Sequence, residues 1–88
     1  MAWEVEITPE GLRHLNRLPD KVRIAVLETI LGSIADNPER AGKPLVGELE
    51  SLYSARRGEF RVIYEIDETN RTVLVHRAQH RRSTYRRR

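Results

Sequence analysis

Two arginines near the middle of the chain, Arg56 and Arg61, are the residues whose type and spacing most favour chemistry. They stand on either side of a predicted turn at Arg57-Gly58, and residues 60–66 alternate apolar and polar side chains, which is typical of a strand. A guanidinium is a planar fork that donates two parallel hydrogen bonds to a phosphate or a carboxylate. Two such groups on one rigid hairpin predict an anion-binding site. The alternative is that Arg61 is a surface residue paired with a neighbouring glutamate.

His80, close to the C-terminus, is a second candidate for chemistry. Histidine is the side chain that exchanges protons most readily near neutral pH, so it is suited to act as a general acid or base beside a bound phosphate. The alternative is a surface histidine without a chemical role. His14 and His76 are weaker candidates, because one is expected on a helix remote from the hairpin and the other in mid-strand.

The positive charge of the chain is concentrated at its C-terminal end. The net charge is +3, and residues 77–88 hold six arginines and no acid. Subtracting these six charges from +3 leaves −3 for residues 1–76. A basic block of this kind, residues 79–88 above all, predicts binding to a polyanion or to an acidic partner. A solvated tail that aids solubility is the competing interpretation.

The length and composition indicate one small globular domain over residues 1–88. The chain contains no cysteine, which excludes a disulfide framework and a thiolate metal site, and with three histidines we expect no metal site of another kind. No apolar run reaches the length that spans a membrane, and the N-terminus lacks the pattern of a signal peptide. These features favour a soluble protein of the reducing cytoplasm that acts without a membrane.

The periodicity of apolar residues predicts an α+β fold in the order β-α-α-β-β-β. Alternation marks the strands, spacings of three and four residues mark the helices, and Pro9, Pro19 and Pro38 mark the boundaries. The predicted strands span residues 2–8, 52–56, 60–67 and 71–78, the helices span 9–18 and 20–37, and residues 38–51 form a loop.

The three C-terminal strands are close enough in sequence to form an antiparallel meander, along which the first strand is expected to pair. Two helices joined by a short Pro-Asp link predict a helical hairpin that covers one face of the sheet. The other face carries Arg61 and is left open and concave by the twist of the sheet. An uncovered basic face is where we expect the site.

The run Tyr53-Ser54-Ala55-Arg56-Arg57-Gly58-Glu59-Phe60-Arg61-Val62-Ile63-Tyr64-Glu65-Ile66-Asp67, preceded by Gly42-Lys43-Pro44-Leu45, resembles the RelE/ParE superfamily of bacterial toxins. The ending His80-Arg81-Arg82-Ser83-Thr84-Tyr85-Arg86 resembles the close of the RelE branch. The resemblance covers essentially the whole chain and includes the order of its elements.

The resemblance implies a toxin of a type II toxin–antitoxin system. RelE-branch toxins are ribosome-dependent endonucleases that cleave messenger RNA in the A site through the 2′-hydroxyl of the RNA, without a metal or another cofactor. The implied partners are the ribosome, the message and a RelB-like antitoxin that is encoded beside the toxin. A ParE-type inhibitor of DNA gyrase is the alternative within the superfamily. A basic binding module without catalytic activity is the alternative if the chain is not an enzyme.

The resemblance also assigns roles to residues of this chain. Arg61 and Arg56 match the arginines that flank the turn and are expected to clamp the phosphate. Tyr85 matches a C-terminal tyrosine that stacks on a base or assists proton transfer, and its alternative is an aromatic that packs the tail onto the sheet. The implied catalytic residues are Arg61, Arg56, Tyr85 and His80, and the implied RNA-binding residues are Arg57, Arg77, Arg81 and Arg82.

One departure from the RelE pattern affects the chemistry. The best-studied RelE toxin has lysines on the strand before the turn, and this chain has no lysine after Lys43. The sequence therefore leaves the general base and the general acid open.

Overall fold

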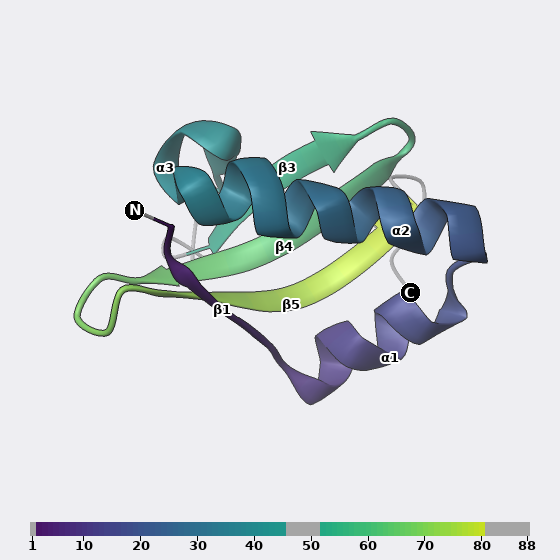
Figure 1. The fold of residues 1–88 in the computed structure, drawn as a ribbon, viewed down its shortest axis with the longest axis horizontal. Coiled ribbons are helices and arrows are strands. Elements are labelled where there is room, and N and C mark those ends of the chain that lie inside the picture. The colour runs from purple at the N-terminus through teal and green to yellow at the C-terminus, as the bar shows by residue number, and fades with distance from the viewer. Residues whose placement is uncertain (1, 46–51, 81–88) are drawn as a thin grey trace.

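A computed structural model describes residues 2–45 and 52–80 of the chain. It confirms the α+β fold, with helices packed against one five-stranded sheet whose strands follow the order β1-β5-β4-β3-β2 (Figure 1). The elements are β1 (Glu4–Ile7), α1 (Pro9–Arg17), α2 (Asp20–Thr29), the π-helical turn η1 (Ile30–Ile34), α3 (Pro38–Ala41), β2 (Lys43–Pro44), β3 (Leu52–Arg57), β4 (Phe60–Asp67) and β5 (Thr72–His80).

The predicted meander is present. β3 pairs with β4 and β4 with β5, both antiparallel, whereas β1 pairs with β5 in parallel. The first turn is Gly58-Glu59, one residue later than predicted, because Gly58 supplies the positive φ of 60° that a two-residue hairpin needs. β5 runs from Thr72 to His80, two residues beyond the predicted end, so the first residues of the basic C-terminal segment belong to the sheet.

α2 and η1 lie across one face of the sheet and supply much of the core (Figure 1). The strand residues of this core alternate along the sheet, which places their neighbours on the open face. A register shift between Ile63 and Tyr64 of β4 makes His76 an extra residue of β5, which is a β-bulge. The buried core residues are Leu15, Val26, Ile30, Ile34, Ala55, Val62, Tyr64, Val73, Val75 and Ala78.

α1 covers the edge of β5 beyond the end of β1. Thr8 caps the helix by accepting a hydrogen bond from the Gly11 amide, and its own amide donates to the Val75 carbonyl at 3.0 Å. Farther along the strand, the Ala78 amide donates to Nδ1 of His14 at 3.3 Å. Burial lowers the pKa of His14 below its usual value, against the opposing effect of Glu10. A neutral imidazole is the form that accepts this bond, so α1 satisfies a strand edge that would otherwise stay unpaired.

The segment predicted as a loop contains two short elements, α3 and β2. α3 begins at Pro38, where proline is favoured in the first turn, and β2 adds an edge strand to β3 through the pairs Lys43–Ser54 and Pro44–Tyr53. Contacts remote in sequence fix both elements, which is why local patterns do not reveal them. Among the described residues no helix is long and apolar enough to cross a membrane.

Candidate phosphate-binding site

Arg56 and Arg61 are directly opposite each other on β3 and β4. Their neighbours Ala55 and Val62 are buried in the core, so the two arginine side chains leave the sheet on the other, open face. Arg56 is exposed and Arg61 is half-buried. Like charges directly opposite on a sheet are unfavourable, and an anion bound between them removes that cost. This confirms the face predicted for Arg61 and adds Arg56 to it.

A pocket of about 630 Å³ opens at this pair, on the side of the sheet edge formed by β2. Four of the described residues that line it are basic and none is acidic. A volume of this size accommodates a small organic ligand or a nucleotide unit rather than a lone inorganic ion. The described lining residues are Arg40, Ala41, Gly42, Lys43, Pro44, Leu45, Ser54, Ala55, Arg56 and Arg61.

One wall of the pocket is held in place by Tyr64. Its buried hydroxyl donates a 2.6 Å hydrogen bond to the Pro38 carbonyl in the first turn of α3. Burial raises the pKa of Tyr64 to about 12, so the phenol remains a donor throughout the physiological range. Gly42 completes the contact, since a Cβ there would lie 2.6 Å from the Tyr64 hydroxyl and 2.7 Å from the Ser54 carbonyl oxygen.

The sequence analysis missed two basic residues of this wall, Arg40 and Lys43. Both side chains are exposed, Arg40 on α3 and Lys43 on β2, where Lys43 is paired with Ser54. The signal available in the sequence was a pair of cations within a stretch punctuated by proline and glycine. Its position beside β3 depends on the long-range contact with Tyr64.

The structure does not bring His80 together with the arginine pair. His80 is opposite Phe60 at the end of β4, and the two rings make an edge-to-face contact with centroids 5.2 Å apart. Phe60 packs against the core on the helix-covered face, whereas Arg61 lies on the open face. A role of His80 in proton transfer stays a prediction.

Of the predicted RNA-binding residues, Arg57 and Arg77 lie in the described part of the chain. Arg57 ends β3 opposite Phe60, and so it belongs to the helix-covered side of the hairpin. Arg77 is opposite Ile63 and is half-exposed, with Nε 3.3 Å from a Glu10 carboxylate oxygen. The remaining predicted residues, Tyr85, Arg81 and Arg82, lie outside the described residues.

His76 is a histidine at the bulge of β5, and it is held by Glu65 with Nε2 and Oε1 3.0 Å apart. Glu65 lies four residues along β4 from Arg61, which corresponds to about 13 Å at the rise of a strand. Without a change in the sheet, His76 therefore does not reach a phosphate held by the arginine pair.

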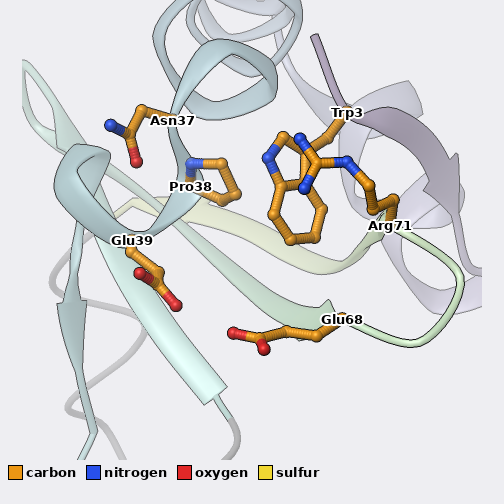
Figure 2. A pocket seen from close by; sticks show the side chains of 6 residues that line it. All are labelled: Trp3, Asn37, Pro38, Glu39, Glu68 and Arg71. Atoms are coloured by element: carbon orange, nitrogen blue, oxygen red, sulfur yellow. The ribbon is translucent and has the colours of Figure 1, made fainter. Parts of the chain in front are cut away.

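A second, smaller pocket of about 230 Å³ lies at the other end of α3 (Figure 2). Arg71 stacks over the Trp3 ring at 4.5 Å, and the carboxylates of Glu39 and Glu68 face each other (Figure 2). A hydrogen bond that protonated Glu39 donates to the Glu68 carboxylate, together with the charge of Glu68, raises the pKa of Glu39. Two carboxylates make this pocket unsuited to a phosphate. Among the described residues no group of three or more His, Cys, Asp or Glu residues is placed to hold a metal ion.

Residues 5–85 match the family described as the ParE toxin of type II toxin–antitoxin systems, parDE. Two curated relatives come from Mycobacterium tuberculosis. Toxin RelE is 43% identical over 84 residues, which cover 96% of this chain and 87% of the relative. Toxin RelG is 41% identical over 87 residues, which cover 99% of this chain and 100% of the relative.

Solved structures show the same fold. The RelBE2 toxin–antitoxin complex from Mycobacterium tuberculosis matches with a TM-score of 0.87 and 39% identity, over 91% of this chain and 92% of that chain. The isolated RelE toxin from E. coli matches with a TM-score of 0.75 and 20% identity, over 90% of this chain and 84% of that chain. The latter likeness concerns the fold alone.

Proposed function

We propose that this chain, which belongs to the ParE toxin family of type II toxin–antitoxin systems and is of the RelE type, is a ribosome-dependent endonuclease that cleaves messenger RNA in the A site. The observation that carries the proposal is the pair Arg56–Arg61 on the open sheet face, in a pocket whose described lining is basic and of nucleotide size. Stopping translation is the consequence for the cell, and the site of action is then the cytoplasm.

The proposed reaction is an internal transesterification. The 2′-hydroxyl of the RNA loses its proton and attacks the adjacent phosphorus, the bond from phosphorus to the 5′-oxygen breaks, and that oxygen receives a proton. The products are a 2′,3′-cyclic phosphate and a free 5′-hydroxyl. Negative charge accumulates on the non-bridging oxygens as the new bond forms, and Arg61 and Arg56 are placed to stabilise it.

Proton transfer is assigned to the C-terminal segment. Tyr85 is the first candidate and His80 the second, because the His80 ring is engaged with Phe60 on the helix-covered face. Arg57, Arg77, Arg81 and Arg82 are proposed to bind RNA outside the reacting phosphate. In this arrangement the pocket orients the RNA and stabilises the charge on the reacting phosphate, and residues outside the pocket carry out the two proton transfers.

The proposed protein partner is a RelB-like antitoxin. The RelBE2 structure is a complex of a toxin with its antitoxin, and this chain shares the fold of that toxin. An acidic segment of such a partner would complement the six arginines of residues 77–88.

The proposal can be tested with purified ribosomes that carry a defined message and whose A site holds no tRNA. We expect the wild-type chain to produce cuts within the A-site codon, and Arg61→Ala to lower the cleavage rate by about 10²–10³-fold, the usual effect of losing one transition-state donor. Arg13→Ala, which removes an exposed cation from α1 and away from the pocket, is the control and should retain the wild-type rate.

Two outcomes would contradict the proposal. Undiminished cleavage by the Arg61→Ala variant would remove the arginine pair from the active site. Intact messages together with gyrase-linked DNA breaks in a supercoiling assay would indicate that the chain inhibits gyrase, as the ParE branch of its superfamily does.

A further inference from the structure

The basic pocket holds more positive charge than one phosphodiester needs. A phosphodiester carries one negative charge, and Arg56 with Arg61 already exceeds it. Arg40 and Lys43 add two further cations on the facing wall, and the described lining contains no acid that would neutralise them. The charge of the pocket is therefore suited to more than one phosphate.

The spacing of the cations separates them into two groups. Arg56 and Arg61 are directly opposite, which places their Cβ atoms about 4.5–5.5 Å apart. Lys43 is opposite Ser54, two residues before Arg56 on β3, so Lys43 and Arg56 are diagonal neighbours about 7–8 Å apart. One phosphate fits between the opposed arginines, and the cations of the wall lie one step farther toward the edge of the sheet.

The wall is built to keep its position. The Tyr64 hydroxyl holds the Pro38 carbonyl at the start of α3, and Gly42 packs directly against the Ser54 carbonyl, where no side chain fits. Arg40 and Lys43 flank this fixed contact in the sequence. Two exposed cations on a segment anchored by a buried hydrogen bond are pre-organised for an anion, because little backbone entropy is lost when it binds.

We propose that Arg40 and Lys43 form a second phosphate subsite, which binds the phosphate next to the one held by Arg56 and Arg61 on the same RNA strand. The inference rests on the proposed function, because it assumes that the ligand of the pocket is RNA. It directs the strand across β4 and β3 toward the edge strand β2. Arg40 and Lys43 are positioning residues in this scheme, since they contact the substrate away from the reacting phosphorus.

Short RNA ligands of two lengths test the subsite in the absence of cleavage. The probes are a dinucleoside monophosphate and a trinucleoside diphosphate, both 2′-O-methylated so that neither is cleaved, titrated into the full chain by NMR or fluorescence. We expect the wild type to bind the longer ligand more tightly. The double variant Arg40→Gln, Lys43→Gln should lose this gain, roughly fivefold for an exposed ion pair, and keep the wild-type affinity for the shorter ligand.

Two comparisons make the result specific. The double variant Arg13→Gln, Arg17→Gln removes the same two charges from the exposed side of α1 and should affect both ligands equally and slightly. Arg61→Gln should weaken both ligands strongly. The slope of log K against log salt for the longer ligand should become shallower by about 0.7 when one phosphate contact to a single strand is lost, in the Arg40→Gln, Lys43→Gln variant and not in the Arg13→Gln, Arg17→Gln control.

The subsite is overturned if the wild type binds both ligands equally, or if the wall variant weakens both by the same factor. These outcomes are separable from the fate of the proposed function. If binding depends on ligand length but the ribosome assay shows no cleavage, the second subsite is supported and the nuclease function is contradicted. If the message is cleaved but binding does not depend on ligand length, the nuclease function is supported and the second subsite is contradicted.

Discussion

Replacing Tyr64 with phenylalanine removes one hydroxyl from the core and tests how the wall of the pocket is held. The ring of Tyr64 is fully buried and its hydroxyl donates to the Pro38 carbonyl at 2.6 Å. Phenylalanine fills almost the same space, so the change deletes the hydrogen bond without opening a large cavity. Tyr64→Phe therefore separates the bond that fixes α3 from the packing of the core.

The expected cost follows from leaving the carbonyl of Pro38 without its partner. Removing one side of a buried hydrogen bond costs about 1–3 kcal/mol. A domain of this length has a free energy of unfolding of roughly 4–13 kcal/mol, so the loss is a substantial share. We expect urea denaturation to show a lower midpoint with an unchanged slope, and the melting temperature to fall by about 4–8 °C for each kcal/mol lost.

The high pKa of Tyr64 adds a pH signature. In the unfolded chain a tyrosine ionises near its ordinary value of 10, and in the folded chain the pKa is about 12. The stability that Tyr64 contributes is therefore fully present below pH 10 and is lost as the pH rises toward 12. Tyr64→Phe should lack this alkaline loss. A variant as stable as the wild type at pH 7, with the same alkaline profile, would refute the role given to this hydroxyl.

Three further predictions concern the surroundings of the site. Gly42→Ala should destabilise the fold by about 1–3 kcal/mol, since its Cβ would lie 2.7 Å from a backbone oxygen, whereas the control Gly32→Ala has nothing within 4 Å of its Cβ and should not, as denaturant titrations would show. Because the pKa of His14 is lowered in the folded chain, stability should fall as the pH drops below about 6.5, and His14→Asn, which retains an acceptor for the Ala78 amide, should flatten that slope in thermal melts. The hydrogen bond to Glu68 and then the charge of Glu68 raise the pKa of Glu39, so Glu68→Gln, which removes that charge, should raise the melting temperature at neutral pH; an unchanged melting temperature would show that the two carboxylates do not interact in solution.

The sequence was informative wherever a local pattern decides the structure. Alternation from Phe60 onward identified β4 and placed Arg61 on the open face, and Pro9 marked the start of α1. The same reasoning put Arg56 and Arg61 together, because a hairpin with a short turn leaves little freedom in its register. These features depend on residues that are close in sequence.

The remaining features depend on contacts between distant residues. α3 and β2 were predicted as a loop because neither has a period long enough to recognise, and the bond from Tyr64 to Pro38 joins residues 26 apart. His80 was grouped with the arginines because a histidine is suited to proton transfer beside a bound phosphate, whereas the bulge at His76 and the pairing with Phe60 set the face on which its ring lies. The number of residues in a strand, bulges included, decides such faces.

Mapping the ends of messenger-RNA fragments from purified ribosomes tests the central claim most directly. The reactions compare the wild type, Arg61→Ala and Arg13→Ala on one defined message. The account predicts cuts within the A-site codon that end in a 2′,3′-cyclic phosphate, at equal rates for the wild type and Arg13→Ala and at least a hundredfold more slowly for Arg61→Ala. Equal cleavage by all three proteins, or an uncut message with the wild type, would contradict it.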